Sequence, residues 1–232
     1  MRTPATNERY PQTAEPGTVG LPVWWYARVA RRLCPIGGKV LDFGCGEGDL
    51  LACLVRDFEV LGFDPVPFVR SRCRTNVPDA IVLEEWESLP PASLDLIVSL
   101  HALARLPRPL STVKRLAGKL APRASLLFVV PNPGGLGHRL KGKRWFAFRD
   151  AAPLSLLSRG EWVMLVRQAG LEVISVCGDG LWDVPYVRAI PVALQRAVLG
   201  VAAAAQVWAP LGRPILPAVL GECLIFVTRR AT

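Results

Sequence analysis

Short apolar runs alternate with amphipathic stretches along most of the chain. Residues 21–33 carry apolar side chains at helical spacing, with arginines on another face, and predict a helix. Apolar runs predict strands over residues 39–43, 59–63, 80–83, 94–100, 124–130, 171–177 and 223–228. Between them, the spacing predicts helices over residues 49–57, 67–75, 110–120 and 158–169. This alternation is typical of an α/β fold with a doubly wound, mostly parallel sheet.

Length and the composition of the N-terminal segment predict the domain organisation. A chain of 232 residues fits one α/β domain. Residues 1–19 hold three prolines and many polar side chains, so we expect a flexible arm, followed by a single domain over residues 20–232. The first residues lack the apolar segment of a signal peptide. The longest apolar stretch, residues 197–211, is shorter than the ~20 residues of a spanning helix and contains Gln206 and Pro210.

Charge and cysteine content narrow the classes of partner. The formal net charge of +9 favours anionic substrates, nucleic acid or a membrane face, but does not choose among them. Six cysteines without a Cys-x-x-Cys pair, and only two histidines, disfavour a zinc site. We therefore expect no metal, reduced thiols and a cytoplasmic location.

A glycine turn after the first predicted strand carries the clearest chemical signal. Gly44, Gly46 and Gly48 alternate with other residues, which differs from the Gly-x-Gly-x-x-Gly spacing of dinucleotide sites, and no Gly-Lys-Ser/Thr follows. Acids at Asp42, Glu47 and Asp49 would repel a pyrophosphate. An acid just before the glycines suits a ligand that carries an ammonium group.

This string resembles motif I of the class I S-adenosylmethionine (SAM) dependent methyltransferases, in the subgroup that acts on small molecules or lipids. The resemblance implies a Rossmann-like sheet of seven strands, mostly parallel with the last strand antiparallel. It implies SAM as cofactor, with the amino-acid end of SAM held by the turn residues Asp42, Gly44, Cys45, Gly46 and Gly48.

Two further segments of the resemblance concern the nucleoside end of SAM. Asp64 and Pro65 end the second predicted strand, where the family places an acid on the ribose hydroxyls. The family also places an acid four residues before a Leu-Pro pair on the adenine amino group. Glu85 takes that position here, with Glu84 as the other candidate, and the backbone N–H of Trp86 would meet the adenine ring.

The strand over residues 94–100 resembles motif IV, whose end lies beside the transferred methyl group. Ser99 and His101 stand there. We consider two roles for His101, a general base or a strand cap that packs against the cofactor. Relatives often carry a Glu-His pair where this chain has Ala104 and Arg105, and a later histidine where it has Pro153. Mechanisms based on those groups do not transfer to this chain.

The expected substrate side begins with a long loop over residues 131–157. It holds a run of cations beside aromatic side chains, from which we select Arg144 and Trp145 as substrate contacts. Asp150 matches an acid of the small-molecule subgroup and is the third candidate in this loop. Such a loop at the strand ends is a usual place for substrate selection.

A second insertion, residues 180–221, precedes the last strand and predicts an apolar helical cap. We select Trp182 and Tyr186 in it as further substrate contacts. A cap of this composition suits a hydrophobic acceptor, a peripheral membrane contact or a dimer interface.

The function we expect is methyl transfer from SAM to a small or lipid-like acceptor. The alternative is a SAM-binding protein with degenerate catalysis that acts as an interaction or membrane-surface module. The third is an RNA methyltransferase, which the basic loop suggests. The segment Ser99-Leu100-His101-Ala102 is not an Asn-Pro-Pro-Tyr type motif, so nucleic acid is disfavoured as a partner.

Overall fold

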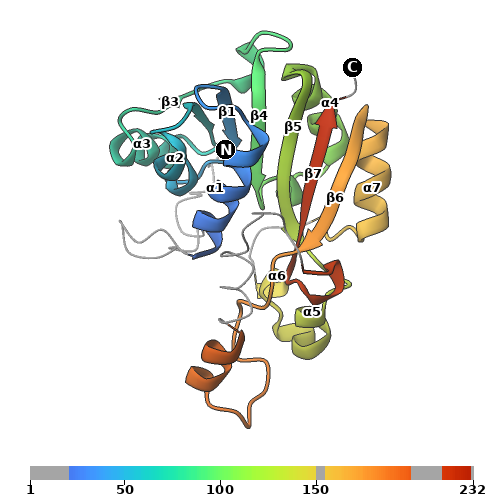
Figure 1. Cartoon of the computed structure of the whole chain (residues 1–232). Helices are drawn as coiled ribbons and strands as arrows, with labels where there is room; N and C mark the ends of the chain where they lie inside the picture. Colours follow the sequence, from blue (N-terminus) through green and yellow to red (C-terminus); the bar gives the residue numbers. More distant parts are fainter. Residues whose placement is uncertain (1–20, 150–154, 200–215, 231–232) are drawn as a thin grey trace, which may run out of the picture.

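A seven-stranded sheet forms the centre of the computed structural model, which describes residues 21–149, 155–199 and 216–230. Its strand order is β3-β2-β1-β4-β5-β7-β6 (Figure 1). The strands are β1 (Lys39–Phe43), β2 (Glu59–Phe63), β3 (Ile81–Val82), β4 (Leu94–Leu100), β5 (Leu120–Pro131), β6 (Leu171–Gly178) and β7 (Cys223–Arg230). β1 to β5 pair in parallel, whereas β7 runs antiparallel to both β5 and β6. This confirms the expected fold class.

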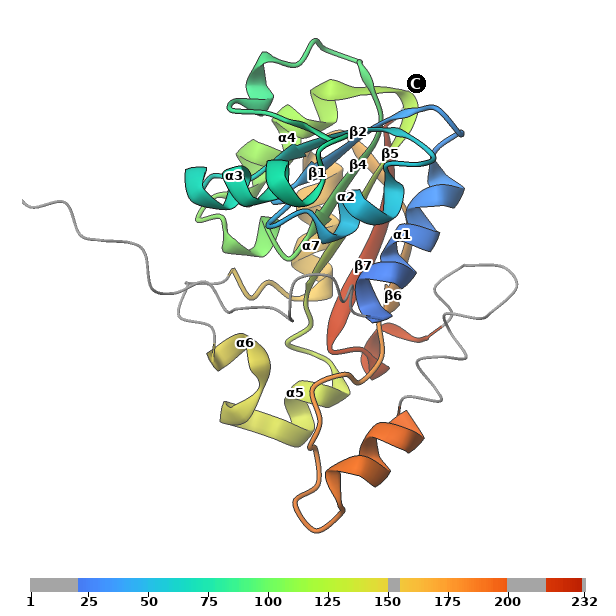
Figure 2. The same ribbon diagram turned by 90° about the vertical axis from the view of Figure 1, so that its left-hand side faces the viewer.

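Helices cover both faces of the sheet (Figures 1 and 2). One face packs against α1 (Leu21–Leu33), α2 (Asp49–Leu54) and α3 (Pro67–Asn76). The other packs against α4 (Pro109–Lys119) and α7 (Arg159–Gln168). Alternate residues of β5 enter the two cores, with Leu127 in the first and Phe128 in the second. A strand buried on both faces has to be apolar throughout, which is the pattern that the sequence shows.

Local signals set where the helices begin. Pro67 and Pro109 stand at the first helical position, where the absent N–H costs no hydrogen bond. Ser158 caps α7, because its hydroxyl accepts from the N–H of Glu161 while the Glu161 carboxylate accepts from the N–H of Ser158. Gly170, with φ +80°, ends that helix.

The segment after β5 differs from the expectation of a long loop. It contains α5 (Leu136–Lys141), the 3-10 turn η3 (Gly142–Arg144) and α6 (Phe146–Arg149). These pieces are four or six residues long where they are α-helical, and only the surrounding packing stabilises helices of that length. The loop prediction over residues 131–157 was therefore wrong for residues 136–149.

The insertion before β7 is partly described. Residues 192–199 are helical, as expected, whereas residues 181–191 form an irregular chain that leads to them. The 3-10 turn η4 (Ala218–Leu220) then joins β7. The expected arm over residues 1–19 lies outside the described residues. No helix in the described part is long and apolar enough to cross a membrane.

Candidate functional site

The glycine turn lies at the carboxyl end of β1, where α/β folds bind their ligands. Gly44, Gly46 and Gly48 all have left-handed backbone, with φ of +87°, +53° and +99°. A Cβ on Gly44 would lie 2.2 Å from the Cβ of Ala102, so no other residue fits there. A Cβ on Gly46 would meet nothing within 4 Å. The turn is thus packed behind Gly44 and Gly48 and open at Gly46.

Asp42 stands just before this turn and is almost fully buried, with 2% of its surface exposed. Its Oδ1 has no hydrogen-bond partner among the described residues. Burial raises the pKa of the Asp42 carboxyl well above its usual range, and the nearby Cys73, Asp64 and Asp49 raise it further. A buried, unpaired carboxylate oxygen is costly for the free protein and suits a cationic ligand group.

Asp64 lies at the end of β2 and its carboxylate faces the same turn. It accepts hydrogen bonds from the backbone N–H of Gly46, at 3.3 Å, and of Val66, at 2.9 Å. The guanidinium of Arg70 donates to the backbone oxygen of Asp64 at 2.7 Å. The acid is therefore held rigidly beside Gly46, while the neighbouring Pro65 is exposed.

The two candidate acids after β3 have different environments. Arg70 and Arg74 bind the carboxylate of Glu84, which lowers the pKa of that group. The carboxylate of Glu85 has no partner among the residues that the structure describes. Trp86 is buried and packs edge-on against Phe43, with ring centroids 5.5 Å apart, so its side chain belongs to the core.

Cys45 and Ser99 have structural roles in the described conformation. Ser99 is fully buried, and its hydroxyl donates to the backbone oxygen of Phe43 at 3.0 Å, which links β4 to β1. The Sγ of Cys45 lies 3.9 Å from the Sγ of Cys73. This contact and burial raise the pKa of the Cys45 thiol.

His101 follows β4 with φ +62°, and its N–H donates to the backbone oxygen of Val129 at 2.9 Å. The imidazole faces the ring of Phe146 at the start of α6, with centroids 6.4 Å apart and planes at 80°. The turn η2 (Leu103–Arg105) comes next, and Ala104 in it is fully buried. His101 thus places an imidazole at the end of β4, beside the ring of Phe146.

The proposed substrate contacts are divided between surface and interior. Arg144 is exposed and Trp182 is half-buried, whereas Trp145 and Tyr186 are buried. The Trp145 indole N–H and the Tyr186 hydroxyl both donate to the carboxylate of Glu222, which the sequence reading missed. Asp150 and Pro153 lie outside the described residues.

The buried network around Glu222 joins the two insertions. Asp183 belongs to the same network. Its carboxylate forms an ion pair with Lys141 and accepts two hydrogen bonds of 2.7 Å from Arg149. Burial raises the pKa of Glu222. A Cβ on Gly137 would lie 2.3 Å from the carboxyl carbon of Glu222, so α5 approaches the network through a glycine.

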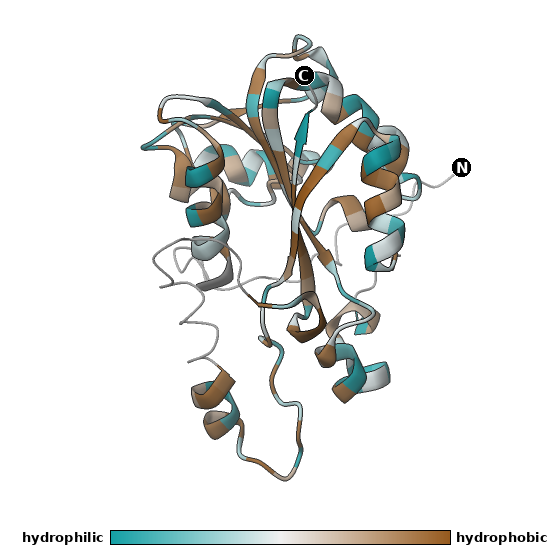
Figure 3. Cartoon of the chain, turned by 45° about the vertical axis from the view of Figure 1, so that its right-hand side comes forward, coloured by the Kyte–Doolittle hydropathy of each residue, from teal (hydrophilic) through white to brown (hydrophobic). Residues whose placement is uncertain are grey.

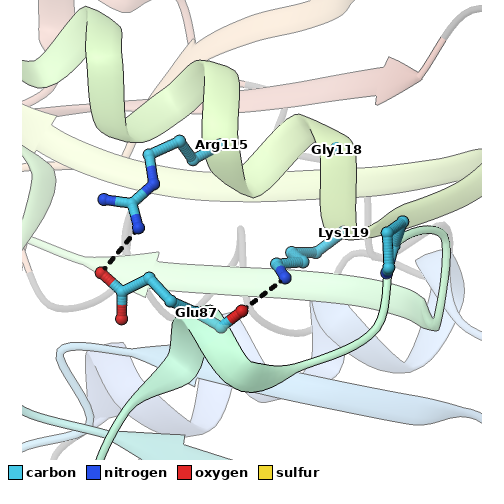
Figure 4. A pocket seen from close by; sticks show the side chains of 5 residues that line it. Glu87, Arg115, Gly118 and Lys119 are labelled. Carbon is cyan, nitrogen blue, oxygen red and sulfur yellow. Dashed lines mark hydrogen bonds and ion pairs between the residues drawn. The ribbon is translucent and has the colours of Figure 1, made fainter.

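A cavity of ≈ 300 Å³ lies at the opposite end of the sheet, beside the end of α4 (Figure 4). Glu87 on its wall binds Arg115 at 3.0 Å, and the backbone oxygen of Glu87 accepts from Lys119 at 2.7 Å. Because α/β folds bind their ligands at the carboxyl ends of the strands, this cavity is not the candidate site. The candidate site is the edge formed by the glycine turn, Asp64 and His101.

A family model described as a methyltransferase domain matches residues 24–176, which is more than half of the chain. The chain belongs to this methyltransferase family. Its cofactor is SAM, and the turn described above fits that group. Asp42 offers an unpaired oxygen to an ammonium, and Gly46 leaves open space beside it. Among the described residues, no group of three potential ligands could hold a metal ion.

Solved structures show the same fold. A complex of the Haloferax volcanii Trm112 methyltransferase activator with a putative methyltransferase matches at TM-score 0.65 and 19% identity, over 90% of this chain and 89% of that chain. A putative methyltransferase from Bacillus halodurans matches at 0.62 and 15%, over 89% and 98%. A SAM-dependent methyltransferase from Mesorhizobium loti matches at 0.60 and 18%, over 91% and 100%. Among curated proteins, none matches the chain.

Proposed function

We propose that this SAM-dependent methyltransferase acts on a small, apolar or lipid-like acceptor. The observation that carries the proposal is the pairing of His101 with Phe146 at the end of β4. An aromatic side chain from α6 there favours an apolar acceptor, while the imidazole can accept a proton. The apolar insertion over residues 181–199 lies at the same end of the molecule (Figure 2).

We assign each part of SAM to a polar or open group at the candidate site. Asp42 receives the ammonium of SAM, the open backbone at Gly46 receives its amino-acid end, and Asp64 receives the ribose hydroxyls. Glu85 rather than Glu84 receives the adenine amino group, because two arginines already bind Glu84. SAM supplies an electrophilic methyl group.

The chain's own groups then have to align the acceptor and remove its proton. Alignment alone supplies much of the rate enhancement of a displacement reaction. His101 is the proposed base for a hydroxyl acceptor, with Phe146 fixing the orientation of the imidazole.

Two measurements on the purified chain test this. Calorimetry reports SAM binding, and release of S-adenosylhomocysteine reports turnover on a panel of hydroxylated lipids, small acids and RNA. We expect His101→Asn, which tolerates the positive φ, to retain SAM binding and to lower turnover ~100-fold on a hydroxyl acceptor. SAM binding without turnover on any acceptor would favour the degenerate alternative, and turnover on RNA alone would refute an apolar acceptor.

A further inference from the structure

The helix over residues 192–199 has its polar and apolar residues in the reverse of the usual places. Gln195 is buried, with 6% of its surface exposed, while Leu194 and Val198 are 53% and 62% exposed. Val192 is exposed as well. A helix that faces water normally buries its aliphatic side chains and exposes its amides. Figure 3 shows this helix as a mainly hydrophobic element at the tip of the molecule.

Gln195 attaches this helix to the turn that precedes it. Its Oε1 accepts from the backbone N–H of Tyr186, at 2.8 Å, and of Val187, at 3.1 Å. Its Nε2 donates to the backbone oxygens of Val187 and Ile190, both at 2.7 Å. One side chain thus satisfies four backbone groups of the preceding turn. Gln195 is therefore held against that turn, while Leu194 and Val198 of the same helix stay exposed.

Polar contacts attach this lobe, which we define as residues 181–199, to the methyltransferase domain. Asp183 binds Lys141 and Arg149, and Tyr186 donates to Glu222. The lobe is therefore a defined structural element, and Figures 1 and 2 show it projecting beyond the sheet at the end where the helices α5 and α6 lie.

The charges of this surface all have one sign. The exposed charged side chains of the lobe are Arg188 and Arg196, and its acid, Asp183, is occupied by the two ion pairs. Residues 136–149 lie at the same end and contain no acid. They add exposed apolar and cationic side chains, namely Leu140, Phe148, Arg139, Lys143 and Arg144.

We propose that the lobe, together with residues 139–148, docks on the surface of an anionic lipid bilayer. Aliphatic side chains flanked by cations are the composition of interfacial membrane contacts, in which the apolar part enters the headgroup region and the cations meet lipid phosphates. Docking here would bring the candidate site to the membrane, although binding itself does not rest on the acceptor proposed above.

Flotation of the full-length protein with defined vesicles tests the docking. We expect it to float with vesicles that contain about one third phosphatidylglycerol and to remain unbound with phosphatidylcholine alone, with binding weakened by salt. Leu194→Glu/Val198→Glu should lose at least tenfold in vesicle affinity. Ile36→Glu/Met164→Glu changes two exposed apolar residues elsewhere, 89% and 57% exposed, and should bind as the wild type does.

A second pair of variants tests the charges. Arg188→Glu/Arg196→Glu should abolish the preference for anionic vesicles, while Arg167→Glu on α7 should retain it. SAM binding by every variant shows that the fold and the cofactor site persist, so a failed methyl-transfer proposal is recognised separately. Absence of wild-type flotation with anionic vesicles would overturn the docking proposal. A wild-type dimer that Leu194→Glu/Val198→Glu dissociates would also overturn it, because the lobe would then be a self-interface.

Discussion

The indole N–H of Trp145 donates a hydrogen bond to the carboxylate of Glu222, which ties the segment after β5 to the residue that precedes β7. Tyr186, from the second insertion, donates to the other oxygen of the same carboxylate. Two segments that are separated in sequence thus share one buried acceptor. The ring of Trp145 in turn packs against that of Phe146, which faces His101.

Replacement of Glu222 should destabilise the protein through the groups it leaves behind. Glu222→Ala leaves a buried N–H and a buried hydroxyl without an acceptor, at about 1–3 kcal/mol each. Glu222→Gln retains one oxygen acceptor and should cost less. Urea unfolding measures both. Equal stabilities of the two variants would contradict a role for the carboxylate as the shared acceptor.

Gly137 provides a second test of the same contact. Gly137→Ala would place a Cβ 2.3 Å from the Glu222 carboxyl carbon, so we expect it to cost about 2–4 kcal/mol in the wild type. In the Glu222→Ala background most of that cost should disappear, because the clashing group is absent. Gly160→Ala, with no neighbour closer than 4.0 Å, is the control. Additive effects of the two substitutions would refute the contact.

The sequence could predict most of the sheet because its signals are local. Strands 39–43, 59–63 and 94–100 were predicted to the residue, since glycine or polar residues lie at the ends of each largely buried apolar run. Glu222 could not be predicted in the same way. Its partners lie 77 and 36 residues away, so nothing near it in sequence marks it as a shared acceptor.

The short helices after β5 were missed for a related reason. α5 lacks a side-chain cap and ends in cations that also suit a surface loop. Its position depends on the approach of Gly137 to Glu222, a tertiary contact. The identity of the cofactor was easier to predict, because Asp42 and the alternating glycines combine an acid and open backbone within one turn.

Substitution by Asn should change the stability of the protein in opposite directions at Asp42 and at Asp64. Asp42→Asn removes a buried carboxyl with an unpaired oxygen, so we expect the free protein to gain about 1 kcal/mol at pH 8. That gain should shrink as the pH falls, because the raised pKa lets the wild-type carboxyl bind a proton in the folded state. Asp64→Asn loses a carboxylate held by two N–H groups and should cost about 1 kcal/mol.

Both variants should bind SAM at least tenfold more weakly, which calorimetry measures alongside thermal unfolding. The opposite signs in stability distinguish a group reserved for a ligand from a group that also supports the turn. If Asp42→Asn destabilised the protein at pH 8 as much as Asp64→Asn, the unpaired oxygen would not be reserved for the cofactor.

Alanine substitutions at two glycines of the turn should distinguish an effect on folding from an effect on SAM binding. Gly44→Ala forces a Cβ to within 2.2 Å of Ala102, and we expect it to cost about 3 kcal/mol or more. Gly46→Ala meets no atom within 4 Å, so only the left-handed backbone opposes it, at about 1–2 kcal/mol. Its methyl group would nevertheless occupy the proposed path of SAM, and affinity should fall at least 100-fold. Gly118→Ala on α4, also with open space, should leave binding unchanged. Full SAM affinity in Gly46→Ala would place the cofactor elsewhere.

Asp179, buried near the end of β6, should make stability depend on pH. Its carboxylate accepts from the Tyr26 hydroxyl at 3.2 Å and the Cys223 N–H at 2.8 Å, but burial raises its pKa from 3.8 to about 7. Between these values the folded state binds more protons than the unfolded state, so the contribution of Asp179 is lost as the pH rises from 4 to 7. Asp179→Asn cannot ionise. Its unfolding free energy, relative to the wild type, should therefore rise across that window by a few kcal/mol, on the order of 1.4 per pKa unit. Asp79→Asn, at an exposed position, is the control, and a constant difference from pH 4 to 7 for Asp179→Asn would exclude this titration.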